Sequence, residues 1–282
     1  MKALVAGLGL IGGSVAKALS RNTDYEVLGF DRSLEVMRAA LDEGAIAAAF
    51  LPEDLPEIDL LFVALRPGDA VKFLAEALPR MKAGALAADL CGVKRWVVNE
   101  VEPLAKARGV RFVGAHPMAG REVSGYWNSD AALFQGAPLI LTPPDGRENE
   151  ATGELARLAL QIGFGRAVVT SPAEHDRRIA YTSQLAHITS CAYVMSPAAL
   201  GYSGFSAGSF RDMTRVARLD AGMWAELFDL NRDALSRELS GLIGRLSEIK
   251  GALDERDGGK LKALLDEGNR RKLSLIEGEG NP

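Results

Sequence analysis

The sequence GLGLIGGS at residues 7–14 decides the fold of this 282-residue chain. It follows the apolar run Ala3–Ala6, which predicts a short buried strand, and it leads into Ser14–Ser20, which predicts a helix. The spacing of the glycines matches GxGxxG, the turn between the first strand and the first helix of a dinucleotide-binding domain. The same glycines interrupt the apolar N-terminus too early for a signal peptide. We therefore expect a Rossmann domain at the start of the chain.

Each part of this turn has a physical task in binding a dinucleotide. Gly7 permits the tight turn, Gly9 lets the pyrophosphate approach the backbone, and Gly12 lets the helix pack closely against the strand. The helix N-terminus, with Ser14 in its first turn, offers free backbone N–H groups to the phosphates, and Leu10 and Ile11 of the turn are counted with the cofactor-binding residues.

Asp31 follows the turn at the end of the second predicted strand, nineteen residues beyond Gly12. A carboxylate at this place accepts hydrogen bonds from the ribose hydroxyls and repels a 2′-phosphate. Arg32 beside it is a residue that can accept that phosphate, so NADP stays the alternative. We expect NAD as the cofactor. The expected cofactor-binding residues are Gly7, Gly9, Leu10, Ile11, Gly12, Asp31 and Arg32.

Short apolar strands alternate with helix-length segments over the first 170 residues. The expected strands are Ala3–Ala6, Glu26–Phe30, Leu60–Ala64, Leu86–Asp89, Arg111–Ala115, Pro138–Leu141 and Arg166–Val169. The expected helices are Ser14–Ser20, Leu34–Glu43, Ala70–Met81, Lys94–Arg108 and Glu148–Ile162. Such alternation predicts an α/β fold, a doubly wound and mostly parallel sheet with helices on both faces.

The strand signals stop after Thr170. Pro172 suits the first turn of a helix, and helical periodicity continues to about Lys272 except in the Gly/Ser-rich stretch 201–209. We therefore place an NAD-binding Rossmann domain at residues 1–170. An all-α, substrate-binding and dimerisation domain follows at residues 171–282, whose apolar positions predict a homodimer.

The composition excludes several classes of function. Apolar residues make up 48% and charged residues 25%, with a net charge of −4, so no general electrostatic surface for nucleic acid or membrane is expected. Cys91 and Cys191 lack CxxC spacing, which favours a reducing compartment over a disulfide or a zinc site. No stretch approaches the ~18 apolar residues of a membrane span. We expect a cytoplasmic protein that binds no metal.

The three histidines all have informative settings. His116 lies in GAHPMAGRE, residues 114–122, just beyond a predicted strand, where open α/β sheets bind ligands, so we expect it to be catalytic. His175 and His187 lie on the first helix after residue 170, and Ser183 shares a face with His187. For His187, helix packing is an equally good interpretation.

A second polar cluster is GSFRDMTR at residues 208–215. Arg211 and Arg215 are four residues apart, so a helix places both guanidinium groups on one face. Like charges there are unfavourable unless an anion offsets them, and arginine is a two-pronged ligand for carboxylate. We expect this cluster to bind an anion. A solvated basic face, with one arginine paired to Asp212, is the alternative.

These motifs together resemble the prephenate/arogenate dehydrogenase family of tyrosine biosynthesis, from Gly7 to about Asn231. The segments that carry the resemblance are GLGLIGGS, GAHPMAGRE, LFQGAPLILTP, AEHD, SQLAH and SFRDMTRVA, followed by Met223-Trp224. The resemblance implies NAD-dependent oxidative decarboxylation of prephenate to 4-hydroxyphenylpyruvate, or of arogenate to tyrosine.

The resemblance also implies roles for single residues. His116 would assist deprotonation of the ring hydroxyl, Arg215 would hold a substrate carboxylate, and Glu122 would pair with that arginine. The other positions implied in or beside the substrate pocket are Arg211, His187, Ser183, His175, Gly208 and Trp224.

The sequence departs from the family pattern at two positions. Gly92 stands where the family often has a serine that hydrogen-bonds the reacting hydroxyl. A water or Cys91 would have to replace that contact, unless Cys91 points into the core. Ala186 replaces the usual proline before the last histidine. We also expect no chorismate mutase or ACT domain, so any inhibition by tyrosine would act at the active site.

Two other classes of function fit parts of the sequence. A 3-hydroxyacid dehydrogenase or pyrroline-carboxylate reductase also joins a Rossmann domain to a helical one. The former normally carries a catalytic lysine there, whereas the lysines after residue 249 lie in a charged terminal region. A non-catalytic NAD(H) sensor would keep the glycine turn but would need neither His116 nor the paired arginines.

Overall fold

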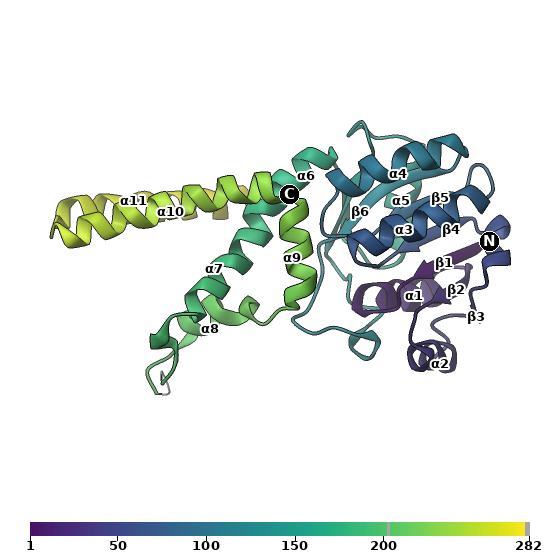
Figure 1. The fold of residues 1–282 in the computed structure, drawn as a ribbon, viewed down its shortest axis with the longest axis horizontal. Coiled ribbons are helices and arrows are strands. Elements are labelled where there is room, and N and C mark those ends of the chain that lie inside the picture. Colours follow the sequence, from purple (N-terminus) through teal and green to yellow (C-terminus); the bar gives the residue numbers. More distant parts are fainter. Residues whose placement is uncertain (202–203, 280–282) are drawn as a thin grey trace. The chain divides into compact units, whose positions relative to one another are not determined.

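The computed structural model describes residues 1–201 and 204–279. The chain forms two compact units, Met1–Arg232 and Asp233–Pro282, each of which is described by itself. Residues 202 and 203 of the expected Gly/Ser-rich stretch lie outside the described residues. The first unit contains a sheet covered by helices and continues into a helical segment (Figure 1).

The sheet of the described residues has eight strands in the order β3-β2-β1-β4-β5-β6-β7-β8. The strands are β1 Lys2–Ala6, β2 Glu26–Phe30, β3 Ala48–Ala49, β4 Leu60–Val63, β5 Leu86–Asp89, β6 Arg111–Pro117, β7 Pro138–Thr142 and β8 Arg166–Val169. All neighbours pair parallel except β6 and β7, which pair antiparallel. The expected mostly parallel, doubly wound sheet is thereby confirmed, and β3 is an addition of two residues.

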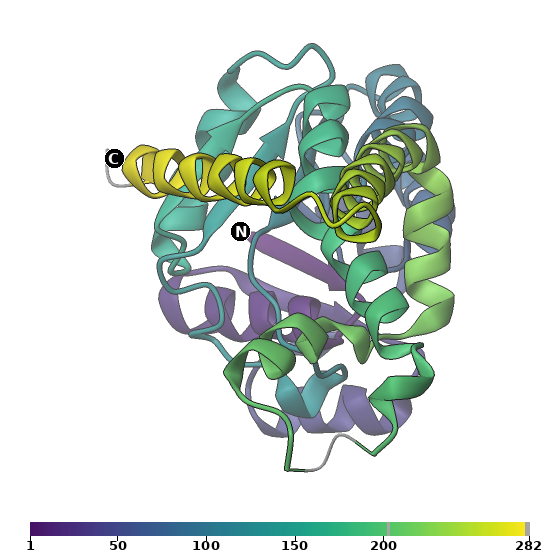
Figure 2. The ribbon, with the colours of Figure 1, turned by 90° about the vertical axis from the view of Figure 1, so that its left-hand side faces the viewer.

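Helices cover both faces of this sheet (Figure 2). The helices before β8 are α1 Leu10–Asn22, α2 Leu34–Asp42, α3 Pro67–Ala77, α4 Arg95–Ala107 and α5 Glu150–Gln161. Buried residues of α1, α2 and α5 share one core cluster, and those of α3 and α4 share another. Alternate residues along the central strands enter the two clusters in turn, as the two-residue period of a strand requires.

The strand order reverses at β1, which pairs with β2 on one side and with β4 on the other. In open α/β sheets a crevice for ligands forms at the carboxyl ends of the strands at such a reversal. The glycine turn follows β1 directly, so the topology puts it at this crevice.

The helical segment begins where the sequence predicted it. The Ser171 side chain accepts a hydrogen bond from Glu174 N–H and caps a helix with Pro172 at its first position. The helices are α6 Pro172–Ile179, α7 Leu185–Val194, α8 Gly208–Thr214 and α9 Ala221–Leu230. A π-helical turn, Ala180–Gln184, joins α6 to α7. The periodicity of the sequence did not predict this turn. The remaining helices are α10 Arg232–Asp254, which belongs to the second unit from Asp233 on, and α11 Gly258–Glu279.

Candidate active site

The glycine turn has the geometry that a dinucleotide requires. Gly7 has a φ of +88°, and a Cβ on it would lie 2.6 Å from the Ala64 carbonyl oxygen. A Cβ on Gly12 would lie 1.8 Å from the Gly7 carbonyl oxygen, so α1 packs closely against the turn. At Gly9, by contrast, a Cβ would meet no atom within 4 Å. That open space over the backbone fits an approaching pyrophosphate.

The start of α1 offers N–H groups to such a phosphate. The first intrahelical hydrogen bond runs from Gly13 N–H to the Gly9 carbonyl oxygen at 2.8 Å, so Leu10 and Ile11 precede it. The Ser14 hydroxyl takes no part in this, because it donates to the Leu10 carbonyl and accepts from Asp130 N–H.

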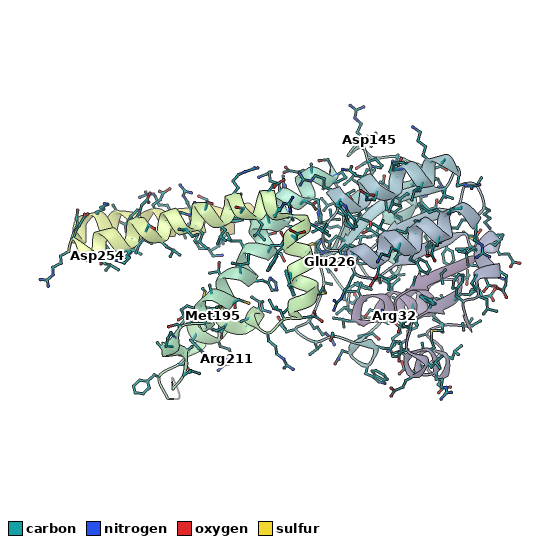
Figure 3. All side chains as sticks on the ribbon, in the orientation of Figure 1. Arg32, Asp145, Met195, Arg211, Glu226 and Asp254 are labelled. Carbon is teal, nitrogen blue, oxygen red and sulfur yellow. The ribbon has the colours of Figure 1, made fainter. Side chains whose placement is uncertain are left out.

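Asp31 lies beside the turn, as its place after β2 predicted. Its Oδ2 accepts a hydrogen bond from Leu8 N–H at 2.9 Å, and its Oδ1 accepts one from Ser33 N–H at 2.9 Å. These bonds hold the carboxylate in place and leave each oxygen a second lone pair for a ribose hydroxyl. Arg32 is exposed next to it (Figure 3).

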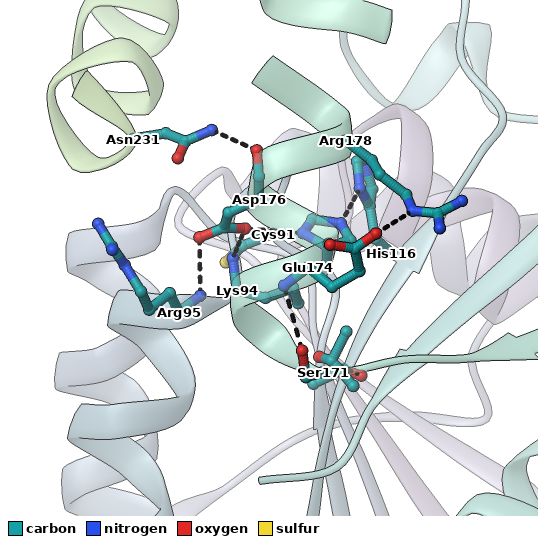
Figure 4. Close-up of polar contacts among 12 residues, drawn as sticks. Cys91, Lys94, Arg95, His116, Ser171, Glu174, Asp176, Arg178 and Asn231 are labelled. Atoms are coloured by element: carbon teal, nitrogen blue, oxygen red, sulfur yellow. Dashed lines mark hydrogen bonds and ion pairs between the residues drawn. The ribbon is translucent and has the colours of Figure 1, made fainter. Parts of the chain in front are cut away.

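His116 lies within β6 rather than just beyond it, because the strand extends to Pro117 through its pairing with β7. Its Nδ1 lies 2.9 Å from His175 Nε2, and His175 Nδ1 lies 2.7 Å from Asp176 Oδ1 (Figure 4). The structure thus joins two of the predicted residues, from β6 and α6, into a chain that ends on a carboxylate. We call His116, His175 and Asp176 the histidine chain.

Asp176 is held by the start of α4. Its Oδ1 accepts from Lys94 N–H at 2.8 Å and its Oδ2 from Arg95 N–H at 2.9 Å. α4 has no capping side chain of its own, so Asp176 satisfies N–H groups that the helix leaves free. The helix thereby fixes the carboxylate, and the carboxylate orients His175.

The hydrogen bonds determine the tautomer of each ring. An ionised carboxylate only accepts, so His175 Nδ1 carries a proton and donates it to Asp176. In the neutral ring His175 Nε2 is then an acceptor, and His116 Nδ1 must donate to it. His116 Nε2 is left with a free lone pair, which suits it to accept a proton from a ligand.

Desolvation keeps the imidazole ring of His116 neutral. Desolvation holds the pKa of His116 well below its usual 6.5, and the nearby His175 and Lys94 lower the pKa further. Burial also lowers the pKa of His175, against the opposing effect of Asp176. An uncharged His116 is the form that can act as a base near neutral pH.

Lys94 is fully buried beside this chain. Its ammonium forms an ion pair with Asp89 and donates to the Ala115 carbonyl at 2.7 Å, next to His116. No role was predicted for Lys94 or Asp176 from the sequence. A lysine five residues after the acid that ends a predicted strand, and an acid directly after a histidine, are the signals that the sequence contains.

Gly92 leaves room beside His116. A Cβ added to it would lie 4.0 Å from His116 Nε2 and 3.5 Å from a methyl carbon of Leu227 on α9. Cys91 cannot take over the role of the family serine, because it is buried in the core and its thiol contacts the Leu65 carbonyl at 3.5 Å. Burial raises the pKa of this thiol.

Arg215 forms an ion pair with Glu122 from the segment after β6. Both side chains are more than two-fifths exposed, so water and solutes reach the pair. α8 ends at Thr214 with Arg215 as its cap residue. Arg211 is exposed and has no carboxylate partner among residues 1–201 and 204–279, Asp212 included. Gly208 is the exposed first residue of α8.

His187 stacks on Trp224, with ring centroids 3.8 Å apart and planes at 27°. Its Nδ1 donates to the Ser183 carbonyl at 2.9 Å, and burial lowers its pKa. Ser183 lies in the π-helical turn and therefore meets His187 through its backbone. The structure brings the side chains of predicted site residues together in three pairs, His116–His175, Glu122–Arg215 and His187–Trp224.

α9 also contacts the sheet portion of this unit. Glu226 Oε1 accepts from Gly68 N–H at 2.7 Å at the start of α3, and Arg66 pairs with Asp220 at 3.0 Å. Figure 3 shows Glu226 on the side of α9 that faces the sheet. These contacts tie the helix that carries Trp224 to the connection after β4.

The described residues contain neither a candidate metal cluster nor a candidate membrane-spanning helix. Residues 1–201 and 204–279 contain no group of three or more His, Cys, Asp or Glu side chains that could hold a metal ion. No helix in the same part of the chain is both long and apolar enough to cross a membrane.

The fold and the site define a class of protein, a Rossmann nucleotide-binding protein with a helical segment that completes a histidine site. Two family models match the chain: the nucleotide-binding domain of prephenate dehydrogenase at residues 15–168 and its dimerization domain at residues 171–267. The chain therefore belongs to the prephenate dehydrogenase family, whose members are oxidoreductases.

Curated relatives agree with this assignment. A cyclohexadienyl dehydrogenase of Zymomonas mobilis is 32% identical over 96% of this chain and 94% of its own length. A prephenate dehydrogenase of Bacillus subtilis is 31% identical over 90% of this chain and 70% of its own length. The crystal structure of prephenate dehydrogenase from A. aeolicus, in complex with hydroxyphenyl propionate and NAD+, has 25% identity and a TM-score of 0.86, with 98% of each chain covered.

Proposed function

We propose that this chain catalyses the NAD-dependent oxidative decarboxylation of prephenate to 4-hydroxyphenylpyruvate, or of arogenate to tyrosine. The observation that carries the proposal is the histidine chain, which leaves His116 Nε2 as an uncharged acceptor. Such an acceptor is what the oxidation of a ring hydroxyl requires. The names of the two relatives, a prephenate dehydrogenase and a cyclohexadienyl dehydrogenase, support a substrate of this class.

His116 Nε2 accepts the proton of the substrate hydroxyl as that carbon loses its hydride. The carboxylate on the opposite ring carbon leaves as CO2, and the electron pair of the broken C–C bond completes the aromatic ring. The proton held by His116 then returns to the phenolic oxygen, so the reaction releases no net proton. Asp176, which is hydrogen-bonded to His175, stabilises the positive charge that builds up on the two imidazole rings.

Arg215 holds the carboxylate of the substrate side chain. It pairs with Glu122 in the structure, and a substrate carboxylate would replace Glu122 as its partner. Arg211, Ser183, His175, His187, Gly208 and Trp224 are proposed to line or border the same pocket.

The residues of the glycine turn and Asp31 would hold NAD, which would supply the hydride acceptor for the reaction. Gly7, Gly9 and Gly12 shape its site, the N–H groups at the start of α1 bind its pyrophosphate, and Asp31 binds the adenosine ribose. Asp31 favours NAD over NADP because its carboxylate repels a 2′-phosphate.

Residues 1–170 would then bind the cofactor and residues 171–282 the substrate and a second copy of the chain. An apolar cleft of about 350 Å³ between α7 and α9 supports a homodimer, since exposed apolar surface of this kind favours association. Met195, at its edge, is 80% exposed. A cytoplasmic location stays a prediction.

The test measures NADH formation with prephenate and with arogenate, each with NAD and with NADP. We expect turnover with at least one of the two substrates and a higher kcat/KM with NAD. A protein that binds NAD but turns over neither substrate would refute the proposal and favour an NAD(H) sensor.

A further inference from the structure

Two buried amides link the histidine chain to the helix opposite it. Asn231, which follows α9, and Gln184, at the end of the π-helical turn, are both 1% exposed. Asn231 Nδ2 donates to the Asp176 carbonyl at 2.8 Å and to Gln184 Oε1 at 2.8 Å. Gln184 Nε2 donates to the Leu227 carbonyl at 3.3 Å.

The direction of these bonds is fixed by the backbone. A carbonyl oxygen only accepts, so the atoms of Asn231 and Gln184 that face carbonyls must be the amide nitrogens. The remaining contact is then a donor on Asn231 facing an acceptor on Gln184. The two side chains therefore form one connected unit with a single arrangement.

The pair of amides, Asn231 and Gln184, joins the two sides of the space around His116. One end holds the backbone of Asp176, which orients His175 and through it His116 Nδ1. The other end holds the backbone of Leu227. The methyl groups of Leu227 and His116 Nε2 face the same space, because each lies within 4.0 Å of the position that a Cβ on Gly92 would take.

Stability alone does not account for the amides. Asn231 Oδ1 is buried and has no hydrogen-bond partner among residues 1–201 and 204–279. An unpaired buried oxygen destabilises a fold, and apolar residues of the same shape often replace such groups without loss.

From these contacts we infer that Asn231 and Gln184 are positioning residues for the proposed reaction: together they hold Asp176 and Leu227 at the places that orient His116 Nε2 toward the substrate. The inference rests on the proposed function, in which His116 accepts the proton. Neither amide touches the substrate.

The test uses Asn231→Leu and Gln184→Met, apolar variants of nearly the same shape. The control is Asp229→Asn, which removes only an exposed ion pair with Arg232 near the end of α9. The first readout needs no turnover. The chain has only three histidines, so selective ¹⁵N-histidine labelling gives a simple NMR titration, with signals assigned by His→Asn variants.

In the wild type we expect His116 to carry its proton on Nδ1 and to titrate below 6.5, as its burial requires. The charged or titratable groups that face it are His175 from α6 and Lys94 from the start of α4. Asp176 and Asp89 stand behind them. In both amide variants the histidine chain is held less firmly and water can reach His116. The pKa of His116 should therefore rise toward its ordinary value.

The second readout is kinetic. A displacement of the base by about 1 Å can lower the rate on the order of a hundredfold, so kcat should fall about tenfold to a hundredfold. The KM for NAD should change little, because the glycine turn makes no contact with either amide. If the amides act as one unit, the double variant should lose little more than the worse single variant.

Folded amide variants with the wild-type His116 titration and kcat would overturn the inference, whatever their thermal stability, and leave the amides a structural role only. Gln184→Met keeps the bond between Asn231 and Asp176, so it is the milder variant should Asn231→Leu fold poorly. A wild type without turnover would refute the proposed function instead, and the NMR titration would still decide the positioning role.

Discussion

Replacing His116 by asparagine tests the proposed chemistry most directly. The asparagine amide lies near the place of the imidazole Nδ1, so it can still donate to His175 Nε2. Nothing then occupies the place of Nε2, and the proton acceptor is lost. Loss of a general base lowers kcat by roughly 10²–10⁴, equivalent to about 3–5 kcal/mol of transition-state stabilisation.

The pH profile identifies the group that is lost. His116 must be uncharged to accept a proton, so the wild-type kcat/KM falls as pH decreases through its pKa. Because burial holds that pKa well below 6.5, the acid limb should lie below 6.5 rather than near neutrality. In His116→Asn this limb should vanish, since no base remains to be protonated.

NADH formation at 340 nm, followed across pH with saturating NAD, gives both quantities. His116→Gln is a matched variant, because its longer side chain brings an amide nearer to the Nε2 position without a base. Compared with His116→Asn, this variant should have a substrate KM closer to that of the wild type, while its kcat stays low. A folded His116→Asn enzyme with wild-type kcat and an unaltered acid limb would show that His116 takes no proton.

Three further substitutions test the other proposed roles. Arg215→Ala should raise the substrate KM about tenfold to a hundredfold and leave NAD affinity unchanged, since a charged hydrogen bond contributes about 1.5–3 kcal/mol; a normal KM would make Arg215 a surface charge only. Asp31→Ala should weaken NAD binding and reduce the discrimination against NADP, and unchanged KM values for both cofactors would contradict the assignment. Gly92→Ser should keep the wild-type thermal midpoint, because a Cβ there meets only ordinary contacts. Its hydroxyl should raise kcat/KM about two- to tenfold through one added hydrogen bond, so a lower value would mean that the hydroxyl blocks His116.

The helix α6, which carries His175 and Asp176, shows what sequence periodicity cannot predict. The segment from Pro172 was predicted as continuous helix, and a π-helical turn at Ala180–Gln184 interrupts it. The turn is held by the bond from Gln184 to Leu227, which lies 43 residues further on. Periodicity within one segment contains no information about such a partner.

The sequence by itself determined the features that depend on local geometry. The glycines of residues 7–14 are required by one tight turn, and short apolar runs separated by helix-length segments predicted seven of the eight described strands. β3 was missed because two residues are too short for an apolar run, and the antiparallel direction of β7 because such a run does not reveal the direction of its neighbour. His116 stood out through its place after a strand.

Only the tertiary structure decided what these residues can do. His116 and His175 are 59 residues apart, and Lys94 and Asp176 are 82 apart, so no spacing predicts their contacts. The direction of Cys91, the pairing of Arg215 with Glu122 and the free lone pair on His116 Nε2 likewise follow from packing. A base acquires its tautomer and its pKa from burial and from partners, and folding alone brings those together.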